Sequence, residues 1–456
     1  MLSPANTDPT LSERAVALSQ ALGAPRSYAR TAASDRVNGA AAGAVCQGLG
    51  GAVALLYFDD PAVHGTYGQN YVASLQRVAL TYPVGDFRLA SDAPQLLPPA
   101  ADAARTIVDY KLAAAPLAAV PESAARIDTV VLGVTDPEAA GRFVADVRTR
   151  LAAQGRDDVL WVAGDTCLNS RFVAAAGPWA EGVWVLISTV PAGALRADSL
   201  RGRFPAARAF YERYAAQYGA NTLAGYEAQG YEVGRVAVAA LERAAAGGRV
   251  DRDTVREAVL ATRHFPGLFG DWSFQGALPR AAGVPPDEYE ALRGDTSLSV
   301  VTAVRVAGGA FDWSSAGVRV YVDALAALRS WHRAHDEALH ALWAAAQESL
   351  GRPDAVEKWT AVIAALTTLD AEFARQGWAF DPLKNKRYVA LVQRGVERLL
   401  RDDRDGAERD LGTAENISRE RPVWGKIATT LRTEIGRPDG RSGPQLYARA
   451  RALLAS

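Results

Sequence analysis

The sequence predicts an α/β protein that is followed by an all-helical region. Over residues 1–317, short runs of Val, Leu, Ile, Trp and Tyr alternate with amphipathic stretches of helical period. Such strand–helix–strand alternation is typical of a largely parallel sheet covered by helices. Over residues 318–456, only the helical period remains. We therefore expect an α/β region at 1–317 and an all-α domain at 318–456.

Each expected strand is a short apolar run bracketed by Gly, Asp or Pro. Runs of this length and composition are typical of strands that are buried on both faces. They lie at residues 52–58, 129–134, 159–163, 183–188 and 301–306. A Gly308-Gly309 turn follows the last run, and we expect the strand pattern to stop there, with the change of regime near residues 313–319.

The expected helices of the α/β region carry apolar residues at three- and four-residue spacing. They lie at residues 36–48, 68–80, 101–111, 137–154, 204–218 and 222–246. Asp136 followed by Pro137 is a clear helix start, because Asp caps the first turn and Pro fits the first helical position.

The C-terminal region is expected to consist of helix pairs. The helices are predicted at residues 321–351, 354–376, 386–401, 405–418, 423–435 and 443–454. Gly395, Ala407 and Leu411 stand at the small and large positions where paired helices touch. The pairs resemble tetratricopeptide repeats, although corresponding alanines, Ala355 and Ala407, are 52 residues apart and not about 34. A plain helical bundle is the alternative, and either arrangement would present a surface to a protein partner.

The composition excludes several classes of protein. The 50 Lys and Arg residues balance 51 Asp and Glu residues, without a basic stripe, so we expect no nucleic-acid partner. Two cysteines exclude a disulfide scaffold and a Cys-rich zinc site, and five histidines leave little for a metal centre. We expect no metal ion and no cofactor.

The chain carries no recognisable targeting or membrane-spanning segment. The N-terminus lacks the basic segment and apolar run of a signal peptide. No uninterrupted apolar stretch reaches the roughly 18 residues of a membrane span. Taken literally, these features predict a chain that stays in the cytoplasm.

Several stretches, taken in order, share the pattern of one family. They include residues 3–11 (SPANTDPTL), 28–35 (YARTAASD), and 52–69, where an apolar strand runs into Asp59-Asp60 and TYGQ follows. Residues 210–219, 230–232 and 267–276 continue the pattern. Over residues 3–317 the chain resembles the branched-chain-amino-acid type of periplasmic binding protein, with its class I receptor ligand-binding fold. The resemblance implies two lobes built on parallel sheets, a ligand in the cleft between them, and a location outside the cytoplasm.

The resemblance also implies a clamp for a zwitterion. In the family, the Ser-Pro-x-x-Thr loop grips the α-carboxylate of the ligand, and Ser3, Asn6 and Thr7 match that loop here. Asp165 matches the acidic residue that pairs with the α-ammonium group, although it is one methylene shorter than the glutamate common there. The alternatives are an ordinary helix cap for Thr7 and a turn residue for Asp165.

Two further positions belong to the expected cleft. Tyr67 matches the aromatic residue that lines the cleft in the family. Thr135 stands where the family often has an aromatic residue, which weakens the match to a standard amino-acid pocket. Family members also carry strands and helices before the Ser-Pro-x-x-Thr loop, so the resemblance implies a first lobe that is incomplete at its N-terminus.

The expected function is non-enzymatic binding of a small polar ligand, an amino acid or related zwitterion, for solute uptake or sensing. The alternative is a ligand-free scaffold that uses the two-lobed fold and the helical tail for protein–protein interaction. We expect no catalytic residue, because Cys167 and His264 lack the local sequence of a nucleophile and its base.

Overall fold

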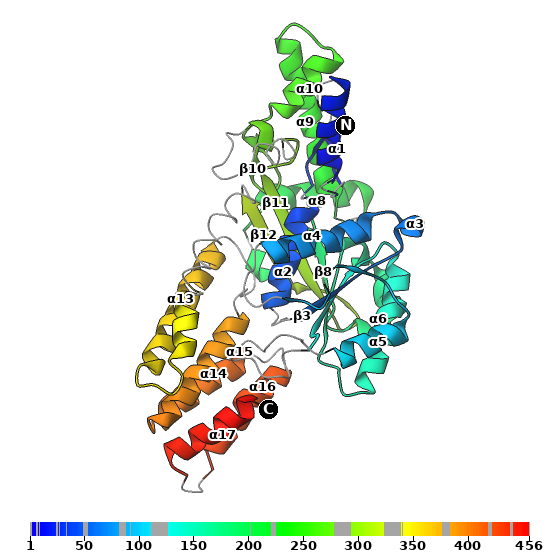
Figure 1. Cartoon of the computed structure of the whole chain (residues 1–456). Helices are drawn as coiled ribbons and strands as arrows, with labels where there is room; N and C mark the ends of the chain where they lie inside the picture. Colours follow the sequence, from blue (N-terminus) through cyan, green and yellow to red (C-terminus); the bar gives the residue numbers. More distant parts are fainter. Residues whose placement is uncertain are drawn as a thin grey trace.

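The computed structural model describes residues 2–455 except 6–7, 9, 24–25, 27, 33, 49–52, 82–87, 92, 111–125, 201, 220–224, 278–292, 323–338, 340, 376–383, 418–421 and 438–440. Eight of its strands form one sheet in the order β12-β11-β8-β7-β6-β3-β4, with β5 beside β3 (Figure 1). They are β3 (Val53–Phe58), β4 (Arg88–Leu89), β5 (Gln95–Leu96), β6 (Thr129–Gly133), β7 (Leu160–Ala163), β8 (Trp184–Ile187), β11 (Leu298–Ala307) and β12 (Ala310–Val322).

The centre of this sheet is parallel, as the strand–helix alternation predicts. Strands β3, β6, β7 and β8 pair in parallel, and β11 joins β8 in the antiparallel direction. All five predicted strands are present. The predicted α/β class, with helices alone after the sheet in the described part of the chain, is confirmed.

Helices cover both faces of the sheet. One face packs against α2 (Asp35–Gly48) and α4 (Tyr67–Thr81), and the other packs against α5 (Ala100–Asp109), α6 (Pro137–Ala152) and α7 (Ser170–Ala176). Alternate residues of each strand point to opposite faces, so Leu55 enters one core and Leu56 the other. We call the sheet and these helices the sheet body.

The strand pattern does not stop at the Gly308-Gly309 turn, and this prediction was wrong. Both glycines have positive φ angles, 61° and 76°, which fits a two-residue hairpin turn. Strand β12 follows and pairs with β11 in the antiparallel direction. Its sequence, AFDWSSAGVRVYV, is interrupted by Asp, Ser, Gly and Arg, so it lacks the continuous apolar run of the inner strands. The expected boundary at 317/318 therefore falls inside β12.

A second, smaller body lies beyond one end of the sheet. It contains α1 (Thr10–Leu22), α8 (Pro205–Tyr218), α9 (Glu227–Ala246) and α10 (Arg252–Leu260), with strand pairs β1 (Leu2–Ser3)–β2 (Ala29–Arg30) and β9 (Phe265–Pro266)–β10 (Asp271–Trp272). Figure 1 shows α1, α9 and α10 together at the top of the molecule. This body has its own apolar core, to which Phe210, Val236 and Phe274 belong. The chain passes between the two bodies after β2, after β8 and before β11.

A buried ion pair connects the first and last parts of the second body. Arg30 is fully buried, and its guanidinium donates to both carboxylate oxygens of Asp295, at 2.7 and 3.1 Å. The hydroxyl of Ser12 accepts from Arg30 at 2.8 Å and donates to Asp295 at 2.9 Å. The third guanidinium nitrogen, Nη1, donates to the carbonyl of Asp8 at 2.8 Å. Since bidentate pairing compensates buried charge best, these bonds tie α1, β2 and the segment before β11 together.

The C-terminal helices include α13 (Ala355–Arg375), α14 (Lys384–Leu400), α15 (Arg404–Ile417), α16 (Pro422–Ile435) and α17 (Gly443–Ala455), and residues 341–348 are helical as well. Helix α14 is central, because it packs against α13, α15 and α17 and also against α2 of the sheet body. The helical tail is therefore attached to the sheet body through α14. Gly395 lies against Leu411 and Ala407 of α15, as expected for touching helices. The tetratricopeptide likeness stays a prediction.

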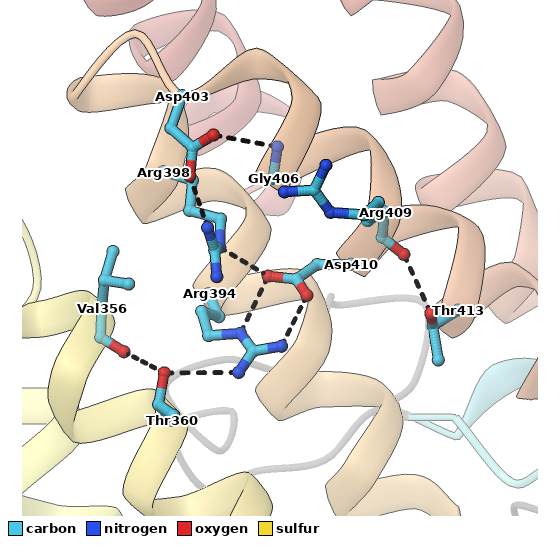
Figure 2. Close-up of polar contacts among 9 residues, drawn as sticks. All are labelled: Val356, Thr360, Arg394, Arg398, Asp403, Gly406, Arg409, Asp410 and Thr413. Atoms are coloured by element: carbon cyan, nitrogen blue, oxygen red, sulfur yellow. Dashed lines mark hydrogen bonds and ion pairs between the residues drawn. The ribbon is translucent and has the colours of Figure 1, made fainter.

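A charge network holds α13, α14 and α15 together (Figure 2). The carboxylate of Asp410 accepts two bonds from Arg394, at 2.6 and 2.8 Å, and a third from Arg398 at 3.0 Å. Arg394 also reaches the hydroxyl of Thr360 on α13, at 3.3 Å. Asp403 pairs with Arg398 and caps α15 through the backbone N–H of Gly406. These bonds satisfy a largely buried carboxylate at the centre of the tail.

Helices α2 and α4 approach so closely that only glycine fits at one position, which gives a test of the packing. A Cβ on Gly39 would lie 2.6 Å from the backbone of Ser74 and Leu75, whereas one on Gly43, in the same helix, would meet nothing within 4 Å. We expect Gly39→Ala to lower the free energy of unfolding by about 1–3 kcal/mol. Gly43→Ala should leave it unchanged or raise it by up to about 1 kcal/mol. Urea unfolding followed by circular dichroism measures both, and equal effects would contradict the packing described here.

Candidate functional site

Polar side chains gather where the parallel strands of the sheet body end. Asp59 follows β3, Thr135 lies just beyond β6, Asp165 just beyond β7, and Ser188 follows β8. The carboxyl ends of parallel strands meet at one edge of a sheet, and in open α/β sheets ligands bind in the crevice outside that edge. Here the edge faces the second body, because the chain crosses to that body directly after β8.

The carboxylate of Asp165 is bonded by two tyrosine hydroxyls. Tyr67, the first residue of α4, donates to Oδ1. Tyr226, which immediately precedes α9, donates to Oδ2 at 2.5 Å. One hydroxyl therefore comes from the sheet body and the other from the second body. Asp165 is therefore a point at which side chains of both bodies meet a charged group.

The surroundings keep both hydroxyls protonated. Burial, and after it the negative charge of Asp165, raise the pKa of Tyr67 well above its ordinary value of 10. The same two causes raise the pKa of Tyr226. Asp35, at the start of α2, adds a smaller effect of the same sign on both tyrosines. Both phenols therefore remain hydrogen-bond donors to Asp165 at neutral pH.

Asp59 and Thr135 form a second polar pair at the same edge. The backbone N–H of Thr135 donates to Oδ2 of Asp59 at 2.7 Å, and the hydroxyl of Thr135 donates to the same oxygen. Oδ1 of Asp59 is buried and accepts no hydrogen bond from the residues that the structure describes. Gly68, at the start of α4, lies so close to Gly133 that any side chain would collide with the Gly133 carbonyl. This close approach brings α4, and with it Tyr67, to the strand ends.

The structure brings some of the predicted site residues together and leaves others apart. Tyr67 and Asp165 are in direct contact, and Thr135 lies on the neighbouring strand end, bonded to Asp59. Ser3 is buried in β1, where its carbonyl accepts from the backbone N–H of Thr31 at 3.0 Å. Asn6 and Thr7 lie outside the described residues. The ligand-binding role of all six residues stays a prediction.

Tyr226 is the residue that the sequence analysis missed. A helix was expected over residues 222–246, which would place Tyr226 in its first turns. Residues 222–224 lie outside the described chain, and α9 begins only at Glu227. Gly225 has a φ angle of 118°, a value that suits glycine, and its N–H donates to the carboxylate of Glu227 at 2.8 Å. The glycine before the tyrosine was the available signal for a turn.

A small polar cavity lies where the chain crosses between the two bodies. Its volume is about 10 Å³, which suits roughly one water molecule. Its polar lining comes from Thr31, Ser188, Gln229, Glu232 and Thr296. Gln229 connects two of the crossings, because its amide nitrogen donates to the Ser188 carbonyl at 3.2 Å and its backbone carbonyl accepts from Thr31.

Glu232 is a buried carboxyl group beside this cavity. It accepts from the backbone N–H of Leu268 at 2.5 Å. Burial raises its pKa from 4.5 to about 7, and the Leu268 bond and the charge of Arg235 only partly oppose that rise. The carboxyl group is therefore partly protonated near neutral pH.

Three further features of the described parts of the chain are the grouping of potential metal ligands, the state of Cys167 and the apolar character of the helices. No three His, Cys, Asp or Glu side chains gather there to hold a metal ion. Cys167 is buried, and burial raises the pKa of its thiol to about 12, so it is not a thiolate at neutral pH. Among the helices that the structure describes, none has the length and apolar character needed to cross a membrane.

Comparisons with known proteins give similarity at the level of solved structures. No protein-family model matches the sequence, and no curated protein sequence matches it. A leucine binding protein of Thermotoga maritima is similar with a TM-score of 0.43 and 18% identity, over 68% of this chain and 71% of that one. A putative branched-chain amino acid ABC transporter from Rhodospirillum rubrum gives 0.45 and 20%, over 68% and 71%. A solute binding protein of Rhodopseudomonas palustris, solved with 3,4-dihydroxybenzoic acid, gives 0.40 and 15%, over 68% and 69%.

The raised pKa of Glu232 predicts a pH dependence of stability. The unfolded chain releases this proton near pH 4.5 and the folded chain near pH 7, so ionisation disfavours the folded state. The contribution of Glu232 should therefore be most favourable below pH 4.5 and fall by about 3 kcal/mol as the pH rises to 7. Urea unfolding at several pH values, comparing wild type with Glu232→Gln, isolates this difference.

The control for this experiment is Glu242→Gln, which changes an exposed carboxylate on the same helix. The gap in unfolding free energy between wild type and Glu232→Gln should change with pH, whereas the gap to Glu242→Gln should stay constant. If the unfolding free energies of all three proteins changed with pH in parallel, burial would not raise the pKa of Glu232, and the prediction would be contradicted.

Proposed function

We propose that this chain binds a small polar ligand that carries an ammonium group, an amino acid or a related zwitterion, in the cleft between the two bodies. The observation that carries the proposal is the position of Asp165. Its carboxylate lies at the carboxyl edge of the parallel sheet and is held by hydroxyls from both bodies. The interactions of a carboxylate in this position depend both on closure of the cleft and on the charge of the ligand that enters the cleft.

The charge of the edge favours a cationic group. Asp59 lies there with one buried oxygen that accepts no hydrogen bond from the described residues. Asp35 lies near enough to raise the pKa values of Tyr67 and Tyr226. An ammonium group near these carboxylates would gain the attraction between opposite charges in addition to its hydrogen bonds, and a neutral or anionic group cannot gain that attraction.

The connections between the bodies suit a binder that opens and closes. In the described parts of the chain, three short segments cross between the two bodies, and hinges are built from such short segments. Strands β11 and β12 also contribute side chains, among them Val300 and Val318, to the core of the second body. The proposal includes no catalytic step, since binding and closure require only the groups already named. It also places the chain outside the cytoplasm, in uptake or sensing, with the helical tail facing a protein partner. The sequence resemblance supports this part of the proposal.

One observation favours the alternative function, a scaffold without a ligand. Both oxygens of Asp165 already accept hydrogen bonds from the protein itself. In a scaffold, this arrangement would be a structural contact that locks the two bodies for protein–protein interaction. The two functions differ in what the Asp165 carboxylate does when an ammonium ligand is added.

Thermal unfolding in the presence of each of the twenty protein amino acids tests the proposal. A ligand that binds only the folded state stabilises it by about 2.7 kcal/mol at a hundredfold excess over Kd. We expect at least one amino acid to raise the unfolding midpoint of the wild type. Asp165→Asn should abolish that rise, because it removes the charge that pairs with the ammonium group.

The matched control is Asp136→Asn, which changes a carboxylate near the same sheet edge that caps α6 and does not bond Tyr67 or Tyr226. Asparagine caps a helix about as well as aspartate, so this variant should keep the rise. A wild type that is folded and shows no rise with any amino acid would contradict ligand binding and favour the scaffold.

A further inference from the structure

We propose that Tyr226 determines specificity by competing with the ligand for Asp165. In this proposal the hydroxyl of Tyr226 holds the position that an ammonium group takes, and the ligand must displace it. The part of the proposal that concerns the ligand rests on the proposed function. The intramolecular contact between Tyr226 and Asp165 does not, and it can be tested without any ligand.

The two tyrosines that bond Asp165 are anchored in different ways. Tyr67 belongs to the sheet body, where its ring stacks on that of Tyr71, with 6.2 Å between the centroids. Its hydroxyl also lies against Gly164, in contact so close that a Cβ there would be 2.6 Å away. Tyr67 is therefore fixed beside Asp165 whatever the second body does.

Tyr226 is attached to the second body. It immediately precedes α9, and α9 contributes Ala228 and Val236 to the core of that body. The residue is only half-buried, so solvent reaches part of it. Any motion that separates the bodies must carry Tyr226 away from Asp165.

The chemistry of the Tyr226 phenol decides which groups of a ligand can displace it from Asp165. The phenol of Tyr226 donates a hydrogen bond to the carboxylate but carries no charge, whereas an ammonium group donates a hydrogen bond and also brings a positive charge. A neutral hydroxyl or amide offers no gain over the phenol that is already present. Tyr226 thus makes the cleft selective for cationic groups over neutral polar groups. It also reduces the apparent affinity of every ligand, which equals the intrinsic affinity multiplied by the fraction of molecules in which the Tyr226–Asp165 contact is open.

Hydrogen–deuterium exchange on the ligand-free protein tests the contact. Tyr226→Phe keeps the ring and removes the hydroxyl. We expect amides in residues 227–232 to exchange about tenfold faster than in wild type, because a charge-assisted bond that holds the start of α9 is lost. The control is Tyr211→Phe, which removes a buried hydroxyl that donates to the Val190 carbonyl at 2.9 Å and does not touch Asp165. Exchange in residues 227–232 that is unchanged in Tyr226→Phe, or that rises equally in the control, would overturn the proposal.

Calorimetric titration with L-leucine and with its hydroxy-acid analogue, in which a hydroxyl replaces the ammonium group, tests the competition. Wild type should bind leucine and not the analogue. Tyr226→Phe should bind leucine about tenfold more tightly and should lose part of the discrimination against the analogue. Weaker binding of leucine by Tyr226→Phe would make Tyr226 a direct ligand contact and overturn the competition.

The two experiments separate the failure of the inference from that of the proposed function. If no variant binds leucine or any other amino acid, the proposed function falls, and the exchange result alone decides whether Tyr226 holds the bodies together. If wild type binds and exchange is unchanged in Tyr226→Phe, the proposed function stands and the competing contact is refuted.

Discussion

The ion pair between Arg30 and Asp295 is the interaction on which the α/β region depends. These residues are 265 positions apart, yet their side chains meet in a bidentate contact with Arg30 fully buried. Their backbones also pair, as a parallel bridge beside β2. Because an unpaired charge in this position would be very unfavourable, the start of the chain can occupy its place only when the segment before β11 is in place as well.

The ion pair between Arg30 and Asp295 also positions the candidate site around Asp165. Thr31 and Ala32 directly follow Arg30, and α2 begins at Asp35, while residues 296–298 lead from Asp295 into β11. Both crossings are therefore held at one end by the ion pair, and Gln229 and Glu232 of α9 line the cavity beside them. Helix α9 follows directly from Tyr226. The distance between the second body and Asp165 thus depends on the same few connections, so the Tyr226–Asp165 contact reports whether the bodies are together or apart.

The sequence predicts the inner strands and most helices within a few residues, because each has a strong local pattern. Strand β12 was missed since its polar and small residues give no apolar run, and it is specified by pairing with β11 through a Gly-Gly turn. The family resemblance placed Tyr67 and Asp165 in one cleft, and the structure has them in contact. Tyr226 could not be found in this way, because the stretches that carry the resemblance do not include it and the local sequence resembles the start of a helix. Contacts between the two bodies depend on the relative positions of the bodies. The hydrophobic periodicity of the sequence does not encode those positions.

The central claim is that Asp165 and Tyr226 hold the two bodies together through a specific bond, and a double-mutant cycle measures it most directly. The free energies of unfolding of wild type, Asp165→Asn, Tyr226→Phe and the double variant give the coupling between the two side chains. A hydrogen bond to a charged group predicts a coupling of about 1.5–3 kcal/mol. A coupling below about 0.5 kcal/mol, the range of independent sites, would contradict the account.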